Sequence, residues 1–460
     1  MVIFTADWLT TIFKEHRGNS EQVSIEEVTS DSRKKTVNAL FIPLVGEKFD
    51  GHAYIEQAID HGAVAAIWNK KKPLPSFLPN NFLVFFVEDT LEALQRLAVE
   101  YRNKINPTVI GITGSNGKTT TKDIVTAVLG SKYKTHATVG NLNNHIGVPL
   151  TILSMKLDTE MLVLEMGMNH FNEIDLLSKI ASPDYAIITN IGESHLEFLG
   201  SRQGIAEAKL EITNGLKSDG KLIIDGDEKL LEHIKESNNI IKCGFDNSND
   251  FIIENVLVKP NQTRFHLSDG MDYSIPLLGK HHAKNASYAI ALGKQLGMNG
   301  EQLKNALNNI QLTSMRFEML KGVNGVSIIN DAYNASPTSM KAAIEVVKEI
   351  PDYDKKVLVL GDIFELGEAS FEMHQSIADV IDQSITALYT LGKNIIGTNE
   401  QVENNKTEIV NQHYESKDDL IKALTPYLNK DTIILFKASR GMKFESMVEK
   451  IITSDESLDI

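Results

Sequence analysis

Residues 111–120 read Gly-Ile-Thr-Gly-Ser-Asn-Gly-Lys-Thr-Thr, and this stretch decides the fold. It completes the apolar run 108–113, which predicts a buried strand, and it opens a predicted helix over 118–129. Glycines at such a turn allow backbone amides to surround phosphate oxygens, and the helix N-terminus adds partial positive charge. We therefore predict a nucleotide site in which Lys118 reaches the β- and γ-phosphates and the Thr119 hydroxyl faces Mg²⁺. The residues assigned to this site are Thr113, Gly114, Ser115, Asn116, Gly117, Lys118, Thr119 and Thr120.

The spacing departs from the strict phosphate-loop pattern G-x-x-x-x-G-K-[ST], because Ile112 stands where the first glycine belongs. The bland alternative is a glycine-rich turn with an incidental lysine. The strand, the glycines, the lysine and the two threonines occur together, and this combination favours the nucleotide interpretation.

Polar side chains follow the two next apolar runs, 161–166 and 185–191. Glu165 ends the first run, and His195 follows the second. Strands that alternate with helices, such as the one predicted over 173–180, form parallel sheets whose ligands bind beyond the carboxyl ends of the strands. Alone, Glu165 would more often be solvated and His195 packed or exposed. The convergence of three strand ends makes Glu165 a candidate Mg²⁺ ligand and adds His195 to the site.

The chain divides into three predicted α/β units, residues 1–105, 106–313 and 314–460, with the first boundary at Asn106–Pro107. We predict a small first unit, a central domain with a parallel sheet of the phosphate-loop ATPase type, and a C-terminal Rossmann-like domain. The apolar strand candidates outside the central run are 39–45, 63–68, 82–87, 221–224, 251–258, 263–267, 326–330, 356–360, 387–391 and 432–436.

Composition excludes several classes of protein. The 460 residues carry 46 Lys plus Arg against 61 Asp plus Glu, a formal net charge of −15, which gives no electrostatic reason to expect a nucleic-acid partner. No stretch approaches the roughly 18 continuous apolar residues that a membrane span needs. The opening residues lack a secretion-signal pattern, so we expect a cytoplasmic protein. The single cysteine, Cys243, excludes an internal disulfide and a multi-cysteine metal site, which leaves oxygen or imidazole ligands for any metal.

A longer series of motifs resembles the ATP-dependent Mur ligases of peptidoglycan synthesis. The matching elements stand in the family's order and span most of the chain: Gly114 to Thr120, Glu165-Met166-Gly167, Thr189 to Gly192 with His195-Leu196, Ala208-Lys209, His282 to Asn285, Arg316-Phe317-Glu318 and Asp331 to Pro337. The resemblance implies ATP as a substrate and two Mg²⁺ sites. It also implies the catalytic set Lys118, Glu165, His195 and Lys209.

For Lys209 the residues and the resemblance point in different directions. Its flanking residues, Glu207 and Glu211, are typical of a solvated helix face. The resemblance implies instead that CO₂ carbamylates Lys209 and makes it a carboxylate-like ligand. One metal is then expected on Thr119 and Glu165, and the other on His195 and carbamylated Lys209. The resemblance further implies the following nucleotide contacts: Asn285 with the adenine, Arg316 with phosphate and Asp331 with the ribose or phosphate side.

Two motifs of the third unit resemble the last-acting ligase of the family, which joins D-alanyl-D-alanine to UDP-N-acetylmuramoyl-tripeptide through an acyl phosphate. They are residues 331–340 and 360–367, and the Asp-Asn-Pro-Arg motif of the sibling that adds a diamino acid is absent from the sequence. In the first unit, residues 29–33 and 46–52 resemble a UDP-sugar site. The substrate-binding residues implied are Ser32, Arg33, Asp50, His52, Asn141, Asn144, Tyr333 and Asn334. Residues 437–440 resemble a Lys-Gly-Ser-Arg element, with Ala438 in place of the glycine.

Two other classes stay open. A folylpolyglutamate synthetase would share the middle domain but lack the UDP-binding unit and the Tyr333-Asn334 element. A non-catalytic nucleotide-binding switch would keep the phosphate loop without needing Glu165, His195 and Lys209 together. We expect the two small-molecule substrates, no nucleic acid, no membrane span and a monomeric chain.

Overall fold

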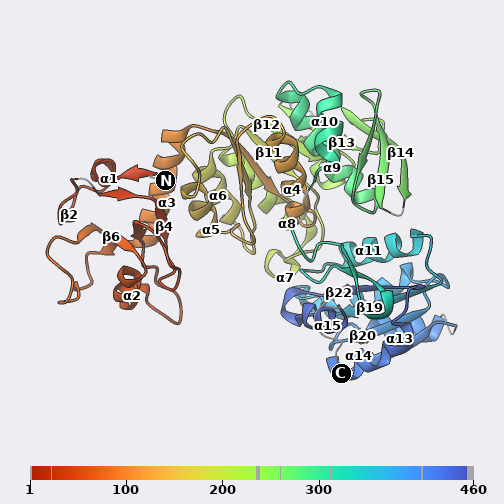
Figure 1. Cartoon of the computed structure of the whole chain (residues 1–460). Helices are drawn as coiled ribbons and strands as arrows, with labels where there is room; N and C mark the ends of the chain where they lie inside the picture. Colours follow the sequence, from red (N-terminus) through yellow and green to blue (C-terminus); the bar gives the residue numbers. More distant parts are fainter. Residues whose placement is uncertain are drawn as a thin grey trace.

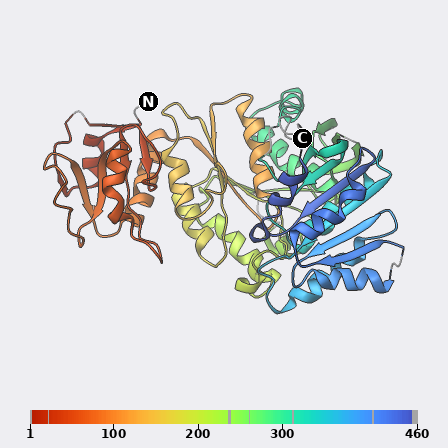
Figure 2. The same ribbon diagram turned by 60° about the horizontal axis from the view of Figure 1, so that its bottom comes forward.

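The computed structural model describes residues 3–21, 23–234, 239–259, 261–310, 313–405 and 408–452. In Figures 1 and 2 the first unit, coloured red to orange, lies at one end of the molecule, and the third, coloured cyan to blue, packs against the opposite side of the middle unit. Among the described residues, sheets of 5, 9 and 6 strands form the centres of the three units. Each range predicted from the sequence contains one of these sheets, and the division into domains itself stays a prediction.

The first unit is a mostly parallel sheet with the order β2-β7-β6-β5-β4, in which only β2 runs antiparallel to its neighbour. A short antiparallel pair, β1-β3, lies beside it. The elements are β1 (Phe4–Thr5), α1 (Ala6–Ile12), β2 (His16–Arg17), β3 (Ser24–Ile25), β4 (Glu27–Thr29), β5 (Ala39–Phe41), α2 (Ile55–Asp60), β6 (Ala63–Asn69), β7 (Leu83–Val87) and α3 (Thr90–Ile105).

Helix α3 joins the first unit to the second. The Asp89 side chain caps its start, and Asn106, with a left-handed φ of 53°, ends it directly before Pro107. The Tyr101 hydroxyl donates a hydrogen bond to the backbone oxygen of Met155, 2.8 Å away. Burial raises the pKa of Tyr101 to about 12. The apolar core around α3 runs without a break into α5 and α6 of the middle unit, so the first unit is held to the second through this helix.

The middle unit is a nine-stranded sheet of order β16-β15-β14-β13-β12-β11-β8-β10-β9, parallel from β9 to β14 and antiparallel from β14 to β16. Its elements are β8 (Thr108–Thr113), α4 (Lys118–Gly130), β9 (Thr135–Ala137), α5 (Gly147–Leu153), β10 (Met161–Glu165), α6 (Glu173–Ala181), β11 (Tyr185–Ile188), α7 (Leu196–Leu199), α8 (Arg202–Leu210), β12 (Lys221–Asp225), β13 (Ile240–Gly244), β14 (Phe251–Lys259), β15 (Gln262–Leu267), β16 (Met271–Ile275), α9 (Lys280–Gln295) and α10 (Gly300–Leu307).

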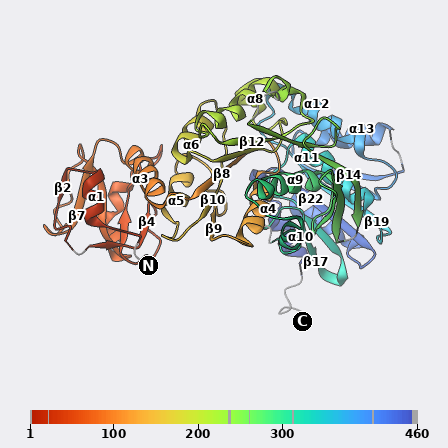
Figure 3. The same ribbon diagram turned by 90° about the horizontal axis from the view of Figure 1, so that it is seen from above.

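Alternate residues of its parallel strands pack into different cores, as the two-residue period of a strand requires. Leu162 and Leu164 face the core shared with α5, α6 and α8, whereas Val163 faces the core shared with α4, α9 and α10. Figure 3 shows α6 and α4 on opposite sides of this sheet. Because both faces are covered, the apolar runs of these strands are nearly continuous.

The third unit is a Rossmann-like sheet of order β17-β18-β22-β19-β20-β21, parallel except for the edge strand β17. Helices α11 to α13 cover one face, and α14 and α15 cover the other. Its elements are β17 (Glu318–Lys321), β18 (Ser327–Asn330), α11 (Pro337–Glu349), β19 (Lys355–Gly361), α12 (Ser370–Gln375), β20 (Ala387–Leu391), α13 (Ile396–Asn405), β21 (Val410–Tyr414), α14 (Lys417–Ala423), β22 (Thr432–Lys437) and α15 (Glu445–Ile451).

The α/β class and its parallel sheets are as predicted from the sequence. The run 185–191 was expected to be one strand, but β11 ends at Ile188 because Asn190 turns to bond the phosphate loop. No helix among the described residues has the length and apolar content of a membrane span.

Candidate active site

The phosphate loop lies at the centre of the middle sheet. Strand β8 pairs with β10 on one side and β11 on the other, and all three are parallel. The phosphate loop, Glu165 and the 189–195 segment therefore meet at the carboxyl ends of these strands, as predicted. Gly114 has a φ of 150°, and a Cβ atom there would lie 1.8 Å from the Thr189 hydroxyl oxygen. Gly117 has a φ of 76° and opens α4. Both conformations favour glycine, and at Gly114 no side chain fits.

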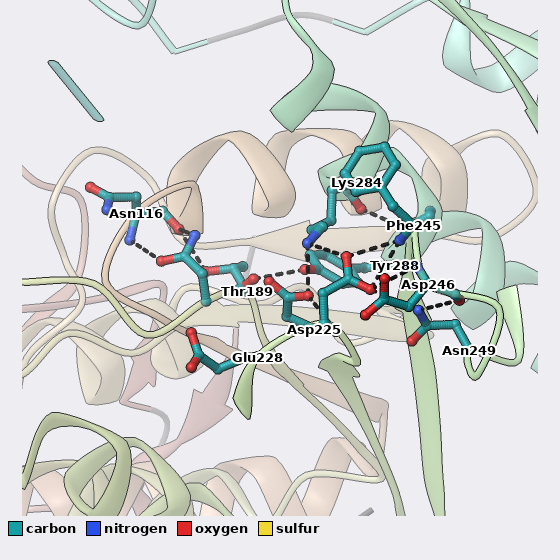
Figure 4. Close-up of polar contacts among 12 residues, drawn as sticks. Asn116, Thr189, Asp225, Glu228, Phe245, Asp246, Asn249, Lys284 and Tyr288 are labelled. Atoms are coloured by element: carbon teal, nitrogen blue, oxygen red, sulfur yellow. Dashed lines mark hydrogen bonds and ion pairs between the residues drawn. The ribbon is translucent and has the colours of Figure 1, made fainter. Parts of the chain in front are cut away.

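The segment after β11 holds the loop in shape. The amide of Asn116 donates to the Asn190 side-chain oxygen at 2.9 Å, and the Thr189 hydroxyl donates to the backbone oxygen of Asn116 at 2.6 Å. Behind them, the Tyr288 hydroxyl of α9 donates to the backbone oxygen of Thr189 at 2.7 Å, a chain of contacts visible in Figure 4. The Ser115 hydroxyl accepts the amide of Gly192 at 2.8 Å. The loop is therefore preorganised by protein contacts.

The Lys118 ammonium folds back over the loop. Its Nζ donates to the backbone oxygen of Gly114 at 2.8 Å. Burial lowers the pKa of Lys118, with Glu165 opposing the shift and Arg316 adding to it. The charges of Glu165 and Arg316 therefore both act on the pKa of Lys118.

Glu165 carries an unsatisfied oxygen. Its side chain is 3% exposed, and Oε1 accepts a hydrogen bond from the Asn143 amide at 2.8 Å. Oε2 is buried and has no hydrogen-bond partner among the described residues. A buried carboxylate oxygen without a donor is costly, and a cation at this point would remove the cost. Asn143 was not singled out from the sequence, although its neighbours Asn141 and Asn144 were.

Lys209 lies inside the protein, 1% exposed, on α8. The flanking glutamates are typical of a solvated face. However, Ile205 and Ala208 of the same helix pack into the apolar core, and Lys209 is buried with them. No carboxylate among the described residues pairs with the Lys209 ammonium. Burial, and after it the charge of Lys118, lowers the pKa of Lys209 well below its ordinary value. An uncharged amine is the form that reacts with CO₂.

His195 contacts the third unit. It precedes α7 with a left-handed φ of 65°, and its Nδ1 lies 2.5 Å from Oε2 of Glu365. Within the described part of the chain, no three histidine, cysteine or acidic side chains form a metal cluster by themselves. A phosphate-bound Mg²⁺ does not require such a cluster, because phosphate oxygens and water supply most of its ligands. The free Oε2 of Glu165 and the Thr119 hydroxyl suit this hard cation, whereas the assignment of His195 and Lys209 to a second metal stays a prediction.

A cavity of about 540 Å³ opens between the middle and third units, and both supply its walls. All of the predicted nucleotide residues except Thr113 and Gly114 lie on it: residues 115–120 of the phosphate loop, Asn285, Arg316 and Asp331. Asn285 packs against the phosphate loop, since a Cβ on Gly117 would lie 3.0 Å from its Oδ1. Glu165, His195 and Lys209 do not line this cavity.

Polar contacts cross the junction of the two units. The Arg316 guanidinium donates to the Thr119 hydroxyl at 3.2 Å and stacks on the Tyr333 ring, 4.0 Å from its centroid. The Ser336 hydroxyl donates to the Asn116 side-chain oxygen at 2.9 Å. The predicted residues Arg316 and Tyr333 thus form one group beside the phosphate loop.

Asp331 and Asn334 bond within their own unit. The Lys437 ammonium lies 2.5 Å from Oδ2 of Asp331 and also donates to the backbone oxygen of Asn334 at 3.3 Å. The amide of Phe317 donates to the other Asp331 oxygen at 3.2 Å. Lys437 belongs to the motif in which Ala438 replaces a glycine.

The sequence did not predict the ion pairs of Lys284 with two aspartates at the far wall of the cavity. The Lys284 ammonium lies 2.8 Å from both Asp225 and Asp227, at the end of β12, and 5.2 Å from the centroid of the Phe245 ring (Figure 4). Burial raises the pKa of Asp225. Burial also raises the pKa of Asp227, but hydrogen bonds from Lys284 and from the amides of Phe245 and Asp246 outweigh it and leave a pKa of about 2. The only sequence signal was Lys284 within the His282 to Asn285 motif.

His282, on the same wall, is 6% exposed, and neither ring nitrogen has a hydrogen-bond partner among the described residues. Burial, with the neighbouring His281 as a second cause, lowers the pKa of His282 well below its ordinary value. A neutral imidazole therefore lines the cavity.

The substrate-binding candidates of the first unit do not line this cavity, and their side chains form hydrogen bonds or ion pairs with neighbouring residues. The Ser32 hydroxyl donates to Gln57 at 2.7 Å, and the His52 ring contacts Asp50 at 2.6 Å. The exposed Arg33 pairs with Asp31 at 2.8 Å. In the middle unit, Asn144 accepts the amide of Gly147 at 2.8 Å, and Asn141 is exposed. Their roles toward a substrate stay predictions.

Comparison with known proteins gives consistent matches along the chain. Three family models match: "Mur ligase family, catalytic domain" over residues 24–102, "Mur ligase middle domain" over 112–293 and "Mur ligase, glutamate ligase domain" over 315–440. A UDP-N-acetylmuramoyl-tripeptide–D-alanyl-D-alanine ligase of Bacillus subtilis is 48% identical, with 94% of each chain covered. Its counterpart from Escherichia coli is 32% identical, with 98% of this chain and 99% of that protein covered.

Solved structures agree. A crystal structure of MurF from Acinetobacter baumannii has a TM-score of 0.86 at 29% identity, covering 97% of this chain and 98% of that one. MurF from Thermotoga maritima, solved in complex with ADP, has a TM-score of 0.80 at 29% identity, covering 92% of this chain and 96% of that one. A Mycobacterium tuberculosis folylpolyglutamate synthase shares the fold at 16% identity, with a TM-score of 0.61 over 78% of this chain. On the three family models and the 48% identical relative, the chain belongs to the Mur ligase family.

Proposed function

We propose that this chain joins D-alanyl-D-alanine to UDP-N-acetylmuramoyl-tripeptide, with cleavage of ATP to ADP and phosphate, in the cytoplasm and as a single chain. The relatives that carry this activity in their names match over nearly the whole of both chains. The observation that carries the proposal is the cavity between the middle and third units, whose walls hold the phosphate loop and Arg316. One chain supplies all of these groups.

In this proposal the ATP phosphates occupy the loop 113–120. Lys118 leaves the backbone oxygens that it bonds in this structure and turns to the β- and γ-phosphates. Arg316 adds a second positive charge from the third unit. The neutral His282, Asn285 and the Asp225–Lys284 wall receive the nucleoside at the other end of the cavity.

Magnesium fits beside the loop, held by Thr119 and by the unpartnered oxygen of Glu165, and a second ion is assigned to His195 and carbamylated Lys209. When bound, these ions neutralise charge on phosphoryl and carboxylate oxygens. The buried Lys209 amine, whose pKa burial lowers, supports the carbamate, because it has no competing ion pair among the described residues.

The reaction runs in two steps. The terminal carboxylate of the tripeptide attacks the γ-phosphorus, ADP leaves, and an acyl phosphate forms. The free amine of D-alanyl-D-alanine then attacks the acyl carbon, the tetrahedral intermediate expels phosphate, and the amine loses its proton to give an amide. Charge develops first on the phosphoryl oxygens and then on the former carboxylate oxygen. Lys118, once it has turned to the phosphates, and Arg316 stabilise this charge.

The UDP moiety is assigned to the first unit, near Ser32, Arg33, Asp50 and His52. The tripeptide then extends along the middle unit past Asn141 and Asn144 toward the phosphate loop. Tyr333 and Asn334 of the third unit are assigned to the substrates at the junction. The stacking of Arg316 on Tyr333 supports this placement, because it brings the third unit to the phosphate loop.

Phosphate release from ATP tests the proposal. The protein is incubated with Mg²⁺, ATP and UDP-N-acetylmuramoyl-tripeptide, with D-alanyl-D-alanine or a single amino acid as the second substrate. We expect release only with the dipeptide. Release that requires glutamate and a folate instead would assign the chain to the folylpolyglutamate synthase class, whose fold it shares. ATP binding without release under any pairing would favour a nucleotide-binding switch.

A further inference from the structure

Residues 195–197 of the middle unit contact one loop of the third unit. The loop follows β19 and comprises residues 362–367, and α7 lies next to the third unit in Figure 1. Two contacts join them: the amide of Glu197 donates to the backbone oxygen of Glu365 at 3.2 Å, and His195 Nδ1 lies 2.5 Å from Glu365 Oε2. One residue of the third unit thus contacts both the backbone and the imidazole of the middle unit's site segment.

The 362–367 loop is built to hold Glu365 in place. Asp362 accepts three backbone amides, from residues 393, 394 and 395, at 2.8 to 2.9 Å. The amide of Ile363 donates to His374, and the amide of Phe364 donates to the Ser439 hydroxyl, both at 2.9 Å. Directly after these three anchored residues, Glu365 has a φ of 63°, a conformation that non-glycine residues rarely adopt. The surrounding contacts keep Glu365 in this strained position.

The other partner is strained as well. His195 has a φ of 65°, and its side chain is only 18% exposed, against 40% for Glu365. An oxygen lone pair 2.5 Å from a ring nitrogen is repulsive unless that nitrogen carries a proton. The contact has the distance of an ion pair, but its angle misses that of a hydrogen bond. Such bonds often become aligned only when ligands close a site. The proximity places a proton on Nδ1, so that in the neutral tautomer the lone pair lies on Nε2.

We propose that Glu365 is a positioning residue: it holds the His195 imidazole through Nδ1–H, so that Nε2 is free to bind the second Mg²⁺. This inference rests on the proposed function. A carboxylate on the remote nitrogen of a metal-binding imidazole fixes its tautomer and raises its basicity. Because the carboxylate comes from the third unit, the metal site of the middle unit is complete only when the two units are docked.

The residue that follows the loop provides a matched control. Glu368 is exposed and, like Glu365, lines a second cavity, of about 880 Å³, between the two units. It forms no ion pair with a described residue. Glu368→Ala therefore removes an equal charge three positions from Glu365 without touching His195.

The first experiment observes the imidazole directly. The full-length protein is labelled with ¹⁵N-histidine, and the ring nitrogens are recorded with a non-hydrolysable ATP analogue and without Mg²⁺, because a metal on Nε2 would itself force the proton onto Nδ1; His195→Asn identifies the signal. We expect a neutral ring protonated at Nδ1 in the wild type and in Glu368→Ala. In Glu365→Ala the signal should shift to the Nε2–H tautomer or to a mixture. An unchanged Nδ1–H signal in Glu365→Ala overturns the proposal, whatever the protein's activity.

The second experiment measures the Mg²⁺ concentration for half-maximal phosphate release with both proposed substrates. Loss of such a carboxylate typically costs 10- to 100-fold in metal affinity, so we expect that increase in Glu365→Ala. Glu365→Gln keeps an oxygen acceptor and should stay within about threefold of the wild type. Equal values for Glu365→Ala and Glu368→Ala overturn the inference, whereas an inactive wild type refutes the proposed function instead.

Discussion

Replacing Lys284 by methionine tests the wall of the cavity. Lys284 is the shared partner of Asp225 and Asp227, and the three side chains are 10 to 19% exposed. Methionine preserves most of the side-chain length but leaves two carboxylates buried without their counter-ion. Removing one partner of a buried ion pair costs about 3–5 kcal/mol. Asp225, whose pKa burial already raises, takes up a proton in the variant, which keeps the cost toward the lower end.

Hydrogen exchange is the suitable assay, because global unfolding of a chain with several domains does not follow one transition. A cost of 3–5 kcal/mol corresponds to roughly 100- to 4,000-fold faster exchange in the peptides that contain β12 and α9. Lys280→Met is the control on the same helix, since Lys280 is 63% exposed and lies 3.8 Å from its partner Glu349. It should change exchange by less than about fivefold. Equal exchange in the two variants would refute the stabilising role assigned to Lys284.

Three further substitutions test the phosphate end. Glu165→Gln should raise the Mg²⁺ requirement and lower kcat at least about 100-fold, because the oxygen without a partner loses its charge. Hydrogen exchange in the peptide that contains β10 should change by less than about fivefold, because Asn143 keeps its acceptor, and much faster exchange there would contradict this. Lys209→Ala should abolish activity and recover part of it with added formate or acetate; a failure of every short carboxylate to rescue would count against the carbamate. Arg316→Lys loses its stacking on Tyr333 and should raise the KM for ATP about 10-fold, and an unchanged KM would remove Arg316 from the nucleotide site.

Sequence alone predicted the centre of the fold because its signals are local. The apolar runs of the buried parallel strands are continuous. The glycines of the phosphate loop, where the backbone lies close to neighbouring groups, directly follow one of these runs. Glu165 could be placed beside the phosphate loop because it ends a neighbouring parallel strand. By contrast, the strands β9, β16, β17 and β21 were missed, since they lie toward the sheet edges, where the apolar pattern is weak. Strand β13 lies inside the sheet, but Lys242 and Gly244 interrupt its apolar run.

The remaining features depend on contacts between distant segments. Lys209 looked solvated because its neighbours in sequence are charged, and only the packing of α8 buries it. Asp225 and Lys284 come together because β12 and α9 end at the same wall. The contact between His195 and Glu365 joins two units across 170 positions of sequence, and neither residue carries a signal of the other.

The fate of one oxygen atom tests the central claim most directly. The terminal carboxylate of the tripeptide is labelled with ¹⁸O, and the phosphate released with ATP, Mg²⁺ and D-alanyl-D-alanine is analysed by mass spectrometry. The account predicts one ¹⁸O atom in each released phosphate and a UDP-linked product extended by the dipeptide. Unlabelled phosphate, or release that does not require D-alanyl-D-alanine, would contradict the acyl phosphate route and the ligase assignment.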